Sequence, residues 1–146
     1  MGSSQKEIQS FKDLKVWQHC HEVRKETSIL ANKLPDEEKY RLKDQLLRAS
    51  RSVTANIVEG YGRFHYQENI QFCRQARGGA LYELLDHISC IIDEKYLSPD
   101  KTAKISTQIT TCIKLLNGYI AYLKKAKQNH ITKEPSIEYG SEPNNQ

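Results

Sequence analysis

The sequence of 146 residues has no apolar segment long enough to cross a membrane, which takes about 20 consecutive apolar residues. Its first six residues contain no apolar signal region, and Lys6 stands where the N-myristoylation pattern requires Ser or Thr. From these absences we expect a cytoplasmic protein.

The sequence also lacks the common signatures of metal and phosphate chemistry. His21 and Glu22 begin an HExxH zinc motif, but Lys25 occupies the position of its second histidine. Glu83 has no histidine three residues later, which a di-iron helix bundle would need. Neither a glycine-rich phosphate loop nor a GxSxG motif is present. We therefore expect no catalytic residue, no metal and no cofactor.

Cysteine is scarce and no two cysteines form a CxxC pair. There are four, at positions 20, 73, 90 and 112. Cys20, Cys73 and Cys112 fall among apolar residues at helical spacing, so we expect free thiols packed as small hydrophobic side chains. A zinc site or a disulfide is the alternative.

What the sequence does have is four stretches in which apolar residues recur at spacings of three and four. Such spacing places the side chains on one face of an α-helix. The clearest stretches are Val16, Cys20, Val23, Thr27, Leu30 and Leu34 near the start, and Ile105, Ile109, Cys112, Leu116, Tyr119 and Leu123 near the end. Because short breaks make consecutive helices neighbours, the pattern predicts an all-α, antiparallel four-helix bundle with up-down-up-down topology.

The predicted bundle occupies residues 10–127. Residues 1–9 are expected to form a flexible leader. Residues 128–146 are expected to be a disordered tail, because they contain Pro135 and Pro143 and few large apolar residues.

Short polar segments predict where each helix begins and ends. Ser10 and Ser98 are expected to cap the first and fourth helices, with Pro99 in the first turn of the fourth. The second helix is expected to begin at Pro35 and to end at Gly60-Tyr61-Gly62-Arg63 with a glycine in left-handed geometry. The four expected helices cover residues 11–33, 35–63, 66–95 and 99–127.

Gly78 and Gly79 lie inside the third expected helix, where glycine costs about 1 kcal/mol relative to alanine. Close approach of a neighbouring helix would explain them. A kink or break in the helix is the alternative.

Polar residues form a second, organised stripe on the second helix, directly beside the apolar one. They span an arc of roughly 80° at 100° per residue. The stripe consists of Arg41, Gln45, Arg48, Ser52, Asn56, Glu59 and Arg63. Ser52, Asn56, Glu59 and Arg63 are spaced to contact one another and are expected to form a polar seam between helices or between subunits. Contact with nucleic acid or with a ligand is the alternative, and an enzyme site is less favoured.

Positive charge is concentrated in two segments of a chain whose formal net charge is +4. Residues 39–77 contain eight bases and three acids, and residues 101–127 contain six lysines and no acid. Such segments can be ordinary solvated surface, or they can bind a polyanion such as RNA or DNA. Under the second interpretation the candidate nucleic-acid contacts are Arg41, Arg48, Arg51, Arg63, Arg74, Arg77, Lys124, Lys125 and Lys127.

Aromatic residues cluster with basic ones at the connection between the second and third helices. The cluster consists of Tyr61, Arg63, Phe64, His65 and Tyr66. It can cap the end of the bundle with apolar surface, or it can stack on unpaired bases. The sequence favours the cap.

Six segments of the chain form a recognisable series: SFKDLKVWQ at residues 10–18, EKY at 38–40, QLLRA at 45–49, ANIVEGYGR at 55–63, YEL at 82–84 and YLS at 96–98. Together they resemble the bacterial four-helix-bundle proteins that are encoded in intervening sequences of 23S rRNA genes. The resemblance covers about residues 10–127 in order. It departs at Thr54, where family members often carry proline.

The resemblance implies a ring-like homopentamer of four-helix bundles with no established catalytic activity. It identifies no active-site residues for this chain. The matching segments contain Arg48, Asn56, Glu59 and Arg63, which we therefore regard as candidates for functional residues. The family is similar in architecture to the basic accessory proteins of diversity-generating retroelements. We therefore expect a non-enzymatic oligomeric scaffold that associates with RNA or a ribonucleoprotein through basic faces. An accessory subunit of a retroelement reverse transcriptase is the alternative, and an enzyme that uses the polar stripe is less favoured.

Overall fold

The computed structural model describes residues 7–133, and this part of the chain is helical without a β-strand. The α-helices are α1 (Lys15–Ala31), α2 (Leu42–Gly62), α3 (Tyr66–Ala76), α4 (Tyr82–Glu94) and α5 (Pro99–Lys133). Two short 3₁₀ turns, η1 (Phe11–Asp13) and η2 (Asp36–Glu38), precede α1 and α2, and a π turn, η3 (Arg77–Leu81), joins α3 to α4. The predicted all-α class is confirmed. Within residues 7–133 no helix is both long and apolar enough for a membrane span.

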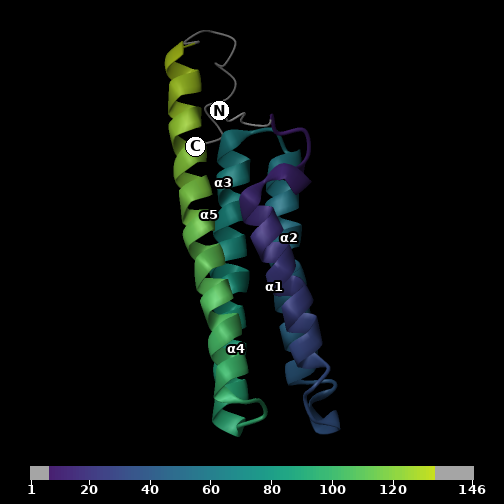
Figure 1. The fold of residues 1–146 in the computed structure, drawn as a ribbon. Coiled ribbons are helices and arrows are strands. Elements are labelled where there is room, and N and C mark those ends of the chain that lie inside the picture. The colour runs from purple at the N-terminus through teal and green to yellow at the C-terminus, as the bar shows by residue number, and fades with distance from the viewer. Residues whose placement is uncertain (1–6, 134–146) are drawn as a thin grey trace.

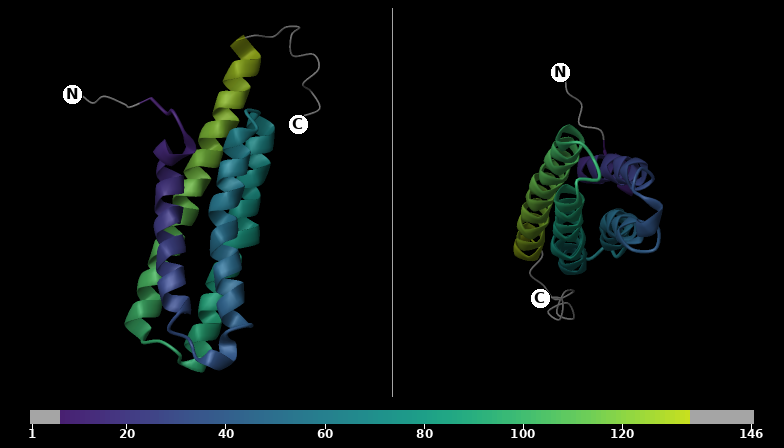
Figure 2. Two further views of the ribbon diagram at one scale, coloured as in Figure 1. Left: turned by 90° about the vertical axis from the view of Figure 1, so that its right-hand side faces the viewer. Right: turned by 90° about the horizontal axis from the view of Figure 1, so that it is seen from below.

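The helices form four long rods, because α3, η3 and α4 follow one another as a single rod (Figure 1). Figure 1 shows the chain reversing direction at each connection between rods, and the end-on view in Figure 2 shows the rods around a common centre. α2 packs against α1 and α3, and α5 packs against the same two helices. Every rod therefore contributes one face to a shared core.

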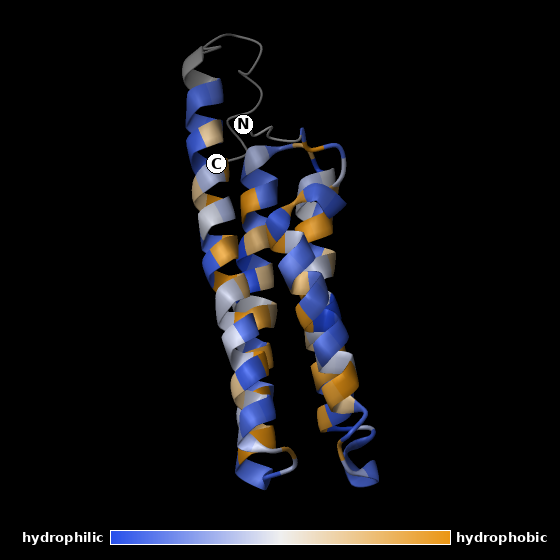
Figure 3. Ribbon diagram, viewed as in Figure 1, coloured by the Kyte–Doolittle hydropathy of each residue, from blue (hydrophilic) through white to orange (hydrophobic). Residues whose placement is uncertain are grey.

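The core is built from the apolar stripes that the sequence predicts. Every member of the two clearest stripes is buried except Tyr119, which is half-buried. Figure 3 shows the hydrophobic residues recurring at intervals along each helix among hydrophilic ones. Burying one Leu, Ile or Val side chain stabilises a fold by about 1.5–3 kcal/mol, so these periodic positions supply most of the drive to pack the rods together.

Ser10 and Ser98 both act as caps, but only Ser98 caps the helix that the sequence predicts. The Ser10 hydroxyl accepts a hydrogen bond from Lys12 N, and the Asp13 carboxylate accepts from Gln9 N at 2.8 Å and Ser10 N at 3.2 Å. This capping box begins the short turn η1, and α1 starts at Lys15 with Leu14 as its N-cap, so the predicted start of the first helix at Phe11 is wrong. Ser98 caps α5 as predicted, with its hydroxyl accepting from Lys101 N at 3.4 Å.

Two further predicted boundaries are wrong. The second helix begins at Leu42 instead of Pro35, because residues 36–38 form the turn η2 and the Glu38 carboxylate accepts from Leu42 N at 3.3 Å. α5 continues to Lys133, so residues 128–133 are helical and do not belong to a tail. No glycine or proline follows Lys127 until Pro135, so nothing in residues 128–133 stops the helix. The rest of the predicted tail, 134–146, and residues 1–6 of the leader lie outside the described residues.

The glycines of the third rod do not mark a close approach between helices, so that prediction is wrong. A Cβ atom at Gly78 or Gly79 would meet nothing within 4 Å, and both residues are exposed. The helix does not break at this point either. It continues through the π turn η3, where π hydrogen bonding replaces the regular α-helical pattern.

Close approach occurs instead at Gly60, in the last part of α2. A Cβ atom there would lie 2.7 Å from Asn69 Oδ1 and 2.9 Å from Phe72 Cβ. Glycine therefore lets α3 pack directly on the backbone of α2. The predicted left-handed glycine at the end of this helix is wrong, because the C-cap Arg63 is right-handed and the positive φ angle, 60°, belongs to Phe64.

Candidate nucleic-acid interface

The first half of the polar stripe on α2 faces α4. The Arg48 guanidinium donates from Nη2 to Glu83 Oε2 and to Gln45 Oε1, each at 2.6 Å. His87 Nε2 lies 3.0 Å from the same Glu83 oxygen. Arg48 is thus engaged in an ion pair between helices, and the sequence could not reveal its partner 35 residues away.

The Glu83 carboxyl responds to these neighbours. Partial burial raises the pKa of Glu83, but hydrogen bonds from His87 and Arg48, together with their charges, lower it by more, so its pKa lies below the ordinary value. A carboxyl with a lowered pKa in the folded state stabilises the fold above its unfolded pKa, and this stabilisation disappears as the pH falls through the folded pKa.

Replacing Glu83 by glutamine should lower the free energy of unfolding by about 1 kcal/mol at neutral pH, because Arg48 loses its ionic partner. The difference from wild type should shrink as the pH falls below about 4.3, where glutamate is protonated in the unfolded chain. Urea unfolding between pH 7 and pH 3 measures this. Asp86→Asn, on the exposed side of α4, is the control. A difference that persists undiminished at pH 3 would contradict the ionic explanation.

The second half of the polar stripe forms contacts mainly within α2. Asn56 Nδ2 donates to Ser52 Oγ at 3.1 Å, and Arg63 Nη2 donates to Glu59 Oε2 at 3.0 Å, as the spacing of four residues predicts. Arg63 also approaches Glu68 of α3 at 3.8 Å. Glu59 and Arg63 remain about half-exposed. Arg41 lies outside this stripe, because it is the N-cap of α2 with non-helical angles.

The nine candidate basic residues do not form one face. Arg48, Arg63, Arg77 and Lys127 are bonded to other side chains; Arg77 donates to Asn117 Oδ1 and Lys127 to Gln67 Oε1, each at 2.8 Å. The remaining five make no side-chain hydrogen bond or ion pair with residues 7–133: they are Arg41, Arg51, Arg74, Lys124 and Lys125. Arg51 lies in a groove between α1 and α2. It is 12 positions before Arg63 and therefore well away from the turn between α2 and α3.

The C-terminal part of α5, which carries Lys124, Lys125 and Lys127, lies at the same end of the molecule as the turn between α2 and α3 (Figure 1). Two contacts fix this arrangement, the Lys127–Gln67 hydrogen bond and the rings of Tyr66 and His130, whose centroids are 6.0 Å apart. Lys124 and Lys125 are exposed within one turn of Lys127. We call this region the aromatic-basic end and define it as Tyr61, Arg63, Phe64, Tyr66, Lys124, Lys125 and Lys127.

The aromatic residues of this end divide into two kinds. Tyr61 is half-buried and packs against the core, which fits the predicted cap. Phe64 is 87% exposed, and among the described residues its ring contacts one other ring, that of Tyr61, at 6.4 Å between centroids, so it adds little to a cap. Its φ of 60° is unusual for a bulky residue and costs about 1–2 kcal/mol. The turn therefore holds an exposed ring in a strained backbone position beside Arg63.

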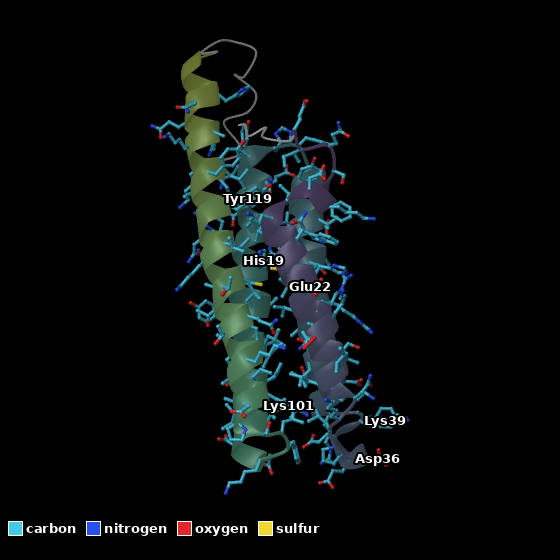
Figure 4. All side chains as sticks on the ribbon, in the orientation of Figure 1. His19, Glu22, Asp36, Lys39, Lys101 and Tyr119 are labelled. Carbon is cyan, nitrogen blue, oxygen red and sulfur yellow. The ribbon has the colours of Figure 1, made fainter. Side chains whose placement is uncertain are left out.

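Sequence reasoning missed a buried polar contact beneath this end. Asn69, 8% exposed, donates from Nδ2 to Tyr119 Oη at 3.2 Å and accepts from Cys73 Sγ at 3.5 Å. Burial raises the pKa of Tyr119 to about 12, against the opposing effect of the Asn69 hydrogen bond. Figure 4 labels Tyr119 on α5. The available signal was an asparagine one residue before Ile70 and four before Cys73, on the apolar side of α3.

The cysteines are free thiols, and Cys20, Cys73 and Cys112 are buried as predicted. Hydrogen bonding with Cys112 and burial raise the pKa of Cys20, and burial raises the pKa of Cys73 to about 12. Both thiols therefore stay protonated at neutral pH and are weak nucleophiles. Within residues 7–133 no three His, Cys, Asp or Glu side chains are grouped as a metal site.

Comparison with known proteins gives one finding. A family model described as 23S rRNA-intervening sequence protein matches residues 12–118. The match spans α1 to α4 and ends within α5, so Lys124, Lys125 and Lys127 lie beyond it. No curated protein matches the chain.

Proposed function

The chain belongs to the 23S rRNA-intervening sequence protein family, and from this we propose that it is a non-enzymatic oligomeric scaffold that associates with RNA or a ribonucleoprotein through its basic surfaces. The match over residues 12–118 confirms the family resemblance of the sequence. We place the protein in the cytoplasm, where such an RNA partner would be met.

The observation that carries this proposal is the aromatic-basic end. An exposed aromatic ring can stack on any unpaired base, and lysines beside it can neutralise the adjoining phosphates. Phe64 supplies the ring, and Lys124 and Lys125 supply charges with no acidic partner in the described residues. This combination favours single-stranded RNA over duplex RNA, whose bases are stacked inside the helix.

The polar stripe on α2 offers poor chemistry for an enzyme, which supports a non-catalytic role. A general base works best when its pKa lies near the working pH. The pKa of Glu83, which pairs with Arg48 of this stripe, is instead lowered, so Glu83 is a weak base at neutral pH. Glu59, in the stripe itself, is half-exposed, and its carboxylate accepts a hydrogen bond from Arg63.

Binding of single-stranded RNA should weaken steeply with salt, because lysines release counterions from the phosphates they neutralise. For single strands the logarithm of affinity falls by about 0.7 per neutralised phosphate for each tenfold rise in salt. With about three phosphates the affinity should fall by about tenfold or more between 50 and 200 mM salt. Fluorescence anisotropy of a labelled uridine oligonucleotide measures it. Absence of binding at low salt, or binding that salt leaves unchanged, would refute the proposed function.

We also propose that the protein assembles as a homo-oligomer, a pentamer by family resemblance, with Ser52, Asn56, Glu59 and Arg63 at or near the subunit contact. Their polar groups are paired with one another along α2. Paired polar groups can be buried between subunits at low cost and can fix the register of the contact.

Light scattering should give a mass about five times the 16.9 kDa of one chain. Glu59→Ala should lower this mass and leave the helicity by circular dichroism unchanged, because an exposed ion pair within one helix contributes only about 0.3–0.5 kcal/mol. Glu22→Ala, which removes an exposed ion pair on α1, is the matched control. A monomeric wild type would refute assembly, and an unchanged mass for Glu59→Ala would refute the role of Glu59.

A further inference from the structure

A second basic surface lies between α1 and α2, away from the aromatic-basic end. Arg51 on its wall is 13 positions before Phe64, about 20 Å along the helix axis. A groove of about 400 Å³ opens there, and its lining consists of Arg24, Lys25 and Ser28 of α1 with Leu47, Ser50 and Arg51 of α2. Three of these side chains are cationic and two carry a hydroxyl, a composition suited to an anion.

Arg24 is held at this groove by a neutral partner. Its Nη1 donates to Thr54 Oγ1 at 2.9 Å, and Thr54 is buried at 2% exposure. The Thr54 hydroxyl in turn donates to the backbone oxygen of Arg51 at 3.3 Å. The hydrogen bond to Thr54 uses one of the five N–H donors of the guanidinium and leaves its charge uncompensated.

The charges around the groove leave a positive excess. Glu22 pairs with Lys25 at 3.2 Å, and both side chains are more than half exposed. Arg24 and Arg51 form no ion pair with any carboxylate of residues 7–133. Asp44 lies on α2 two turns before Arg51, about 10 Å along the axis. Two guanidinium groups from different helices therefore border one polar hollow, and no carboxylate of the described residues pairs with them.

We infer that the groove between α1 and α2 binds a phosphate group, with Arg24 and Arg51 donating to its oxygens. Guanidinium groups match phosphate geometry because they present parallel N–H donors in a rigid plane. The Ser28 hydroxyl is a further donor on the same wall. The inference rests on the proposed function in taking that phosphate from an RNA backbone, and free inorganic phosphate or a nucleotide offers the same chemistry.

Inorganic phosphate tests the site without RNA. In ¹⁵N-labelled protein, titration with inorganic phosphate at constant ionic strength should shift the side-chain Nε–H resonances of Arg24 and Arg51 along one saturable curve. Arg74, a basic residue of α3 without a partner in the described chain, is the internal control. Equal shifts at Arg74, or no saturable shift at Arg24 and Arg51, would overturn the inference.

A uridine oligonucleotide without terminal phosphates tests whether the groove binds the RNA backbone. All of its phosphates are internal, so its binding cannot come from a free phosphate group. Arg51→Gln should weaken its binding about threefold or more and make the salt dependence shallower by about 0.7, whereas Lys33→Gln, at an exposed lysine outside both basic segments, should not. Arg51→Gln leaves the Arg24–Thr54 hydrogen bond in place, so its fold is expected to persist. Arg24→Gln should give the same loss, and its circular dichroism checks that it is folded.

The outcomes distinguish this inference from the proposed function. If the wild type binds no RNA while phosphate still shifts Arg24 and Arg51, the groove stands as a free-phosphate site and the proposed function fails. If RNA binding persists unchanged in Arg51→Gln and Arg24→Gln but depends on Phe64, the groove inference is wrong and the proposed function stands.

Discussion

Replacing Phe64 by alanine should lower the affinity for single-stranded RNA by about 5- to 150-fold, because stacking of one base on an aromatic ring contributes about 1–3 kcal/mol. The loss should not come from unfolding, since the ring is 87% exposed and packs on little of the protein. Anisotropy titrations at fixed low salt measure the affinity, and thermal melting measures the stability.

Two further variants sharpen this test. Phe64→Gly should lose the same affinity and yet be more stable than Phe64→Ala, because glycine adopts a φ of 60° without strain. Tyr82→Ala removes another exposed aromatic ring, on α4, and should leave RNA binding unchanged. Equal losses in Phe64→Ala and Tyr82→Ala would mean that general surface changes, and not stacking at the turn, control binding.

Gly60→Ala should reduce the free energy of unfolding by about 1–3 kcal/mol, the usual cost of overpacking a tight core. The added methyl group would lie 2.7 Å from Asn69 Oδ1, 2.9 Å from Phe72 Cβ and 3.2 Å from the Asn69 backbone oxygen. Because one of these atoms is backbone, α3 must move as a whole to relieve the contact. Such a movement also disturbs the hydrogen bond from Asn69 to Tyr119.

Gly62→Ala is the matched control, two residues further along the same helix. A Cβ atom there meets nothing within 4 Å, so alanine should stabilise the protein by up to about 1 kcal/mol through its higher helix propensity. Urea unfolding of both variants gives the comparison. Destabilisation of similar size at both positions would show that loss of glycine flexibility, and not close packing at Gly60, is responsible.

The core, the Ser10 cap and the start of the last helix could be predicted from the sequence because they depend on near neighbours in the chain. The stripe from Val16 to Leu34 needs only the period of the helix, and the caps at Ser10 and Ser98 need only the next three residues. A helix end without a local signal was less predictable: α5 passes Lys127 because nothing before Pro135 interrupts it.

The candidate site was less predictable because its contacts join residues far apart in the chain. The sequence shows Arg48 and Glu83 as separate charges, and only packing of α2 on α4 makes them a pair. Arg24 carried no signal at all, since its partner Thr54 is 30 residues away. Gly60 and Gly78 look alike in the sequence, and only the position of α3 gives them different roles.

The π turn η3 gives the gene for this protein one place where its length can change. A π turn holds one residue more than the α-helical turn that it replaces. Deleting a single codon at Gly78 or Gly79 would therefore return the third rod to a regular α-helix and would keep Leu84 in the core and Glu83 beside Arg48. Because the space around both glycines is open, these two codons tolerate substitution as well as the loss of one of them.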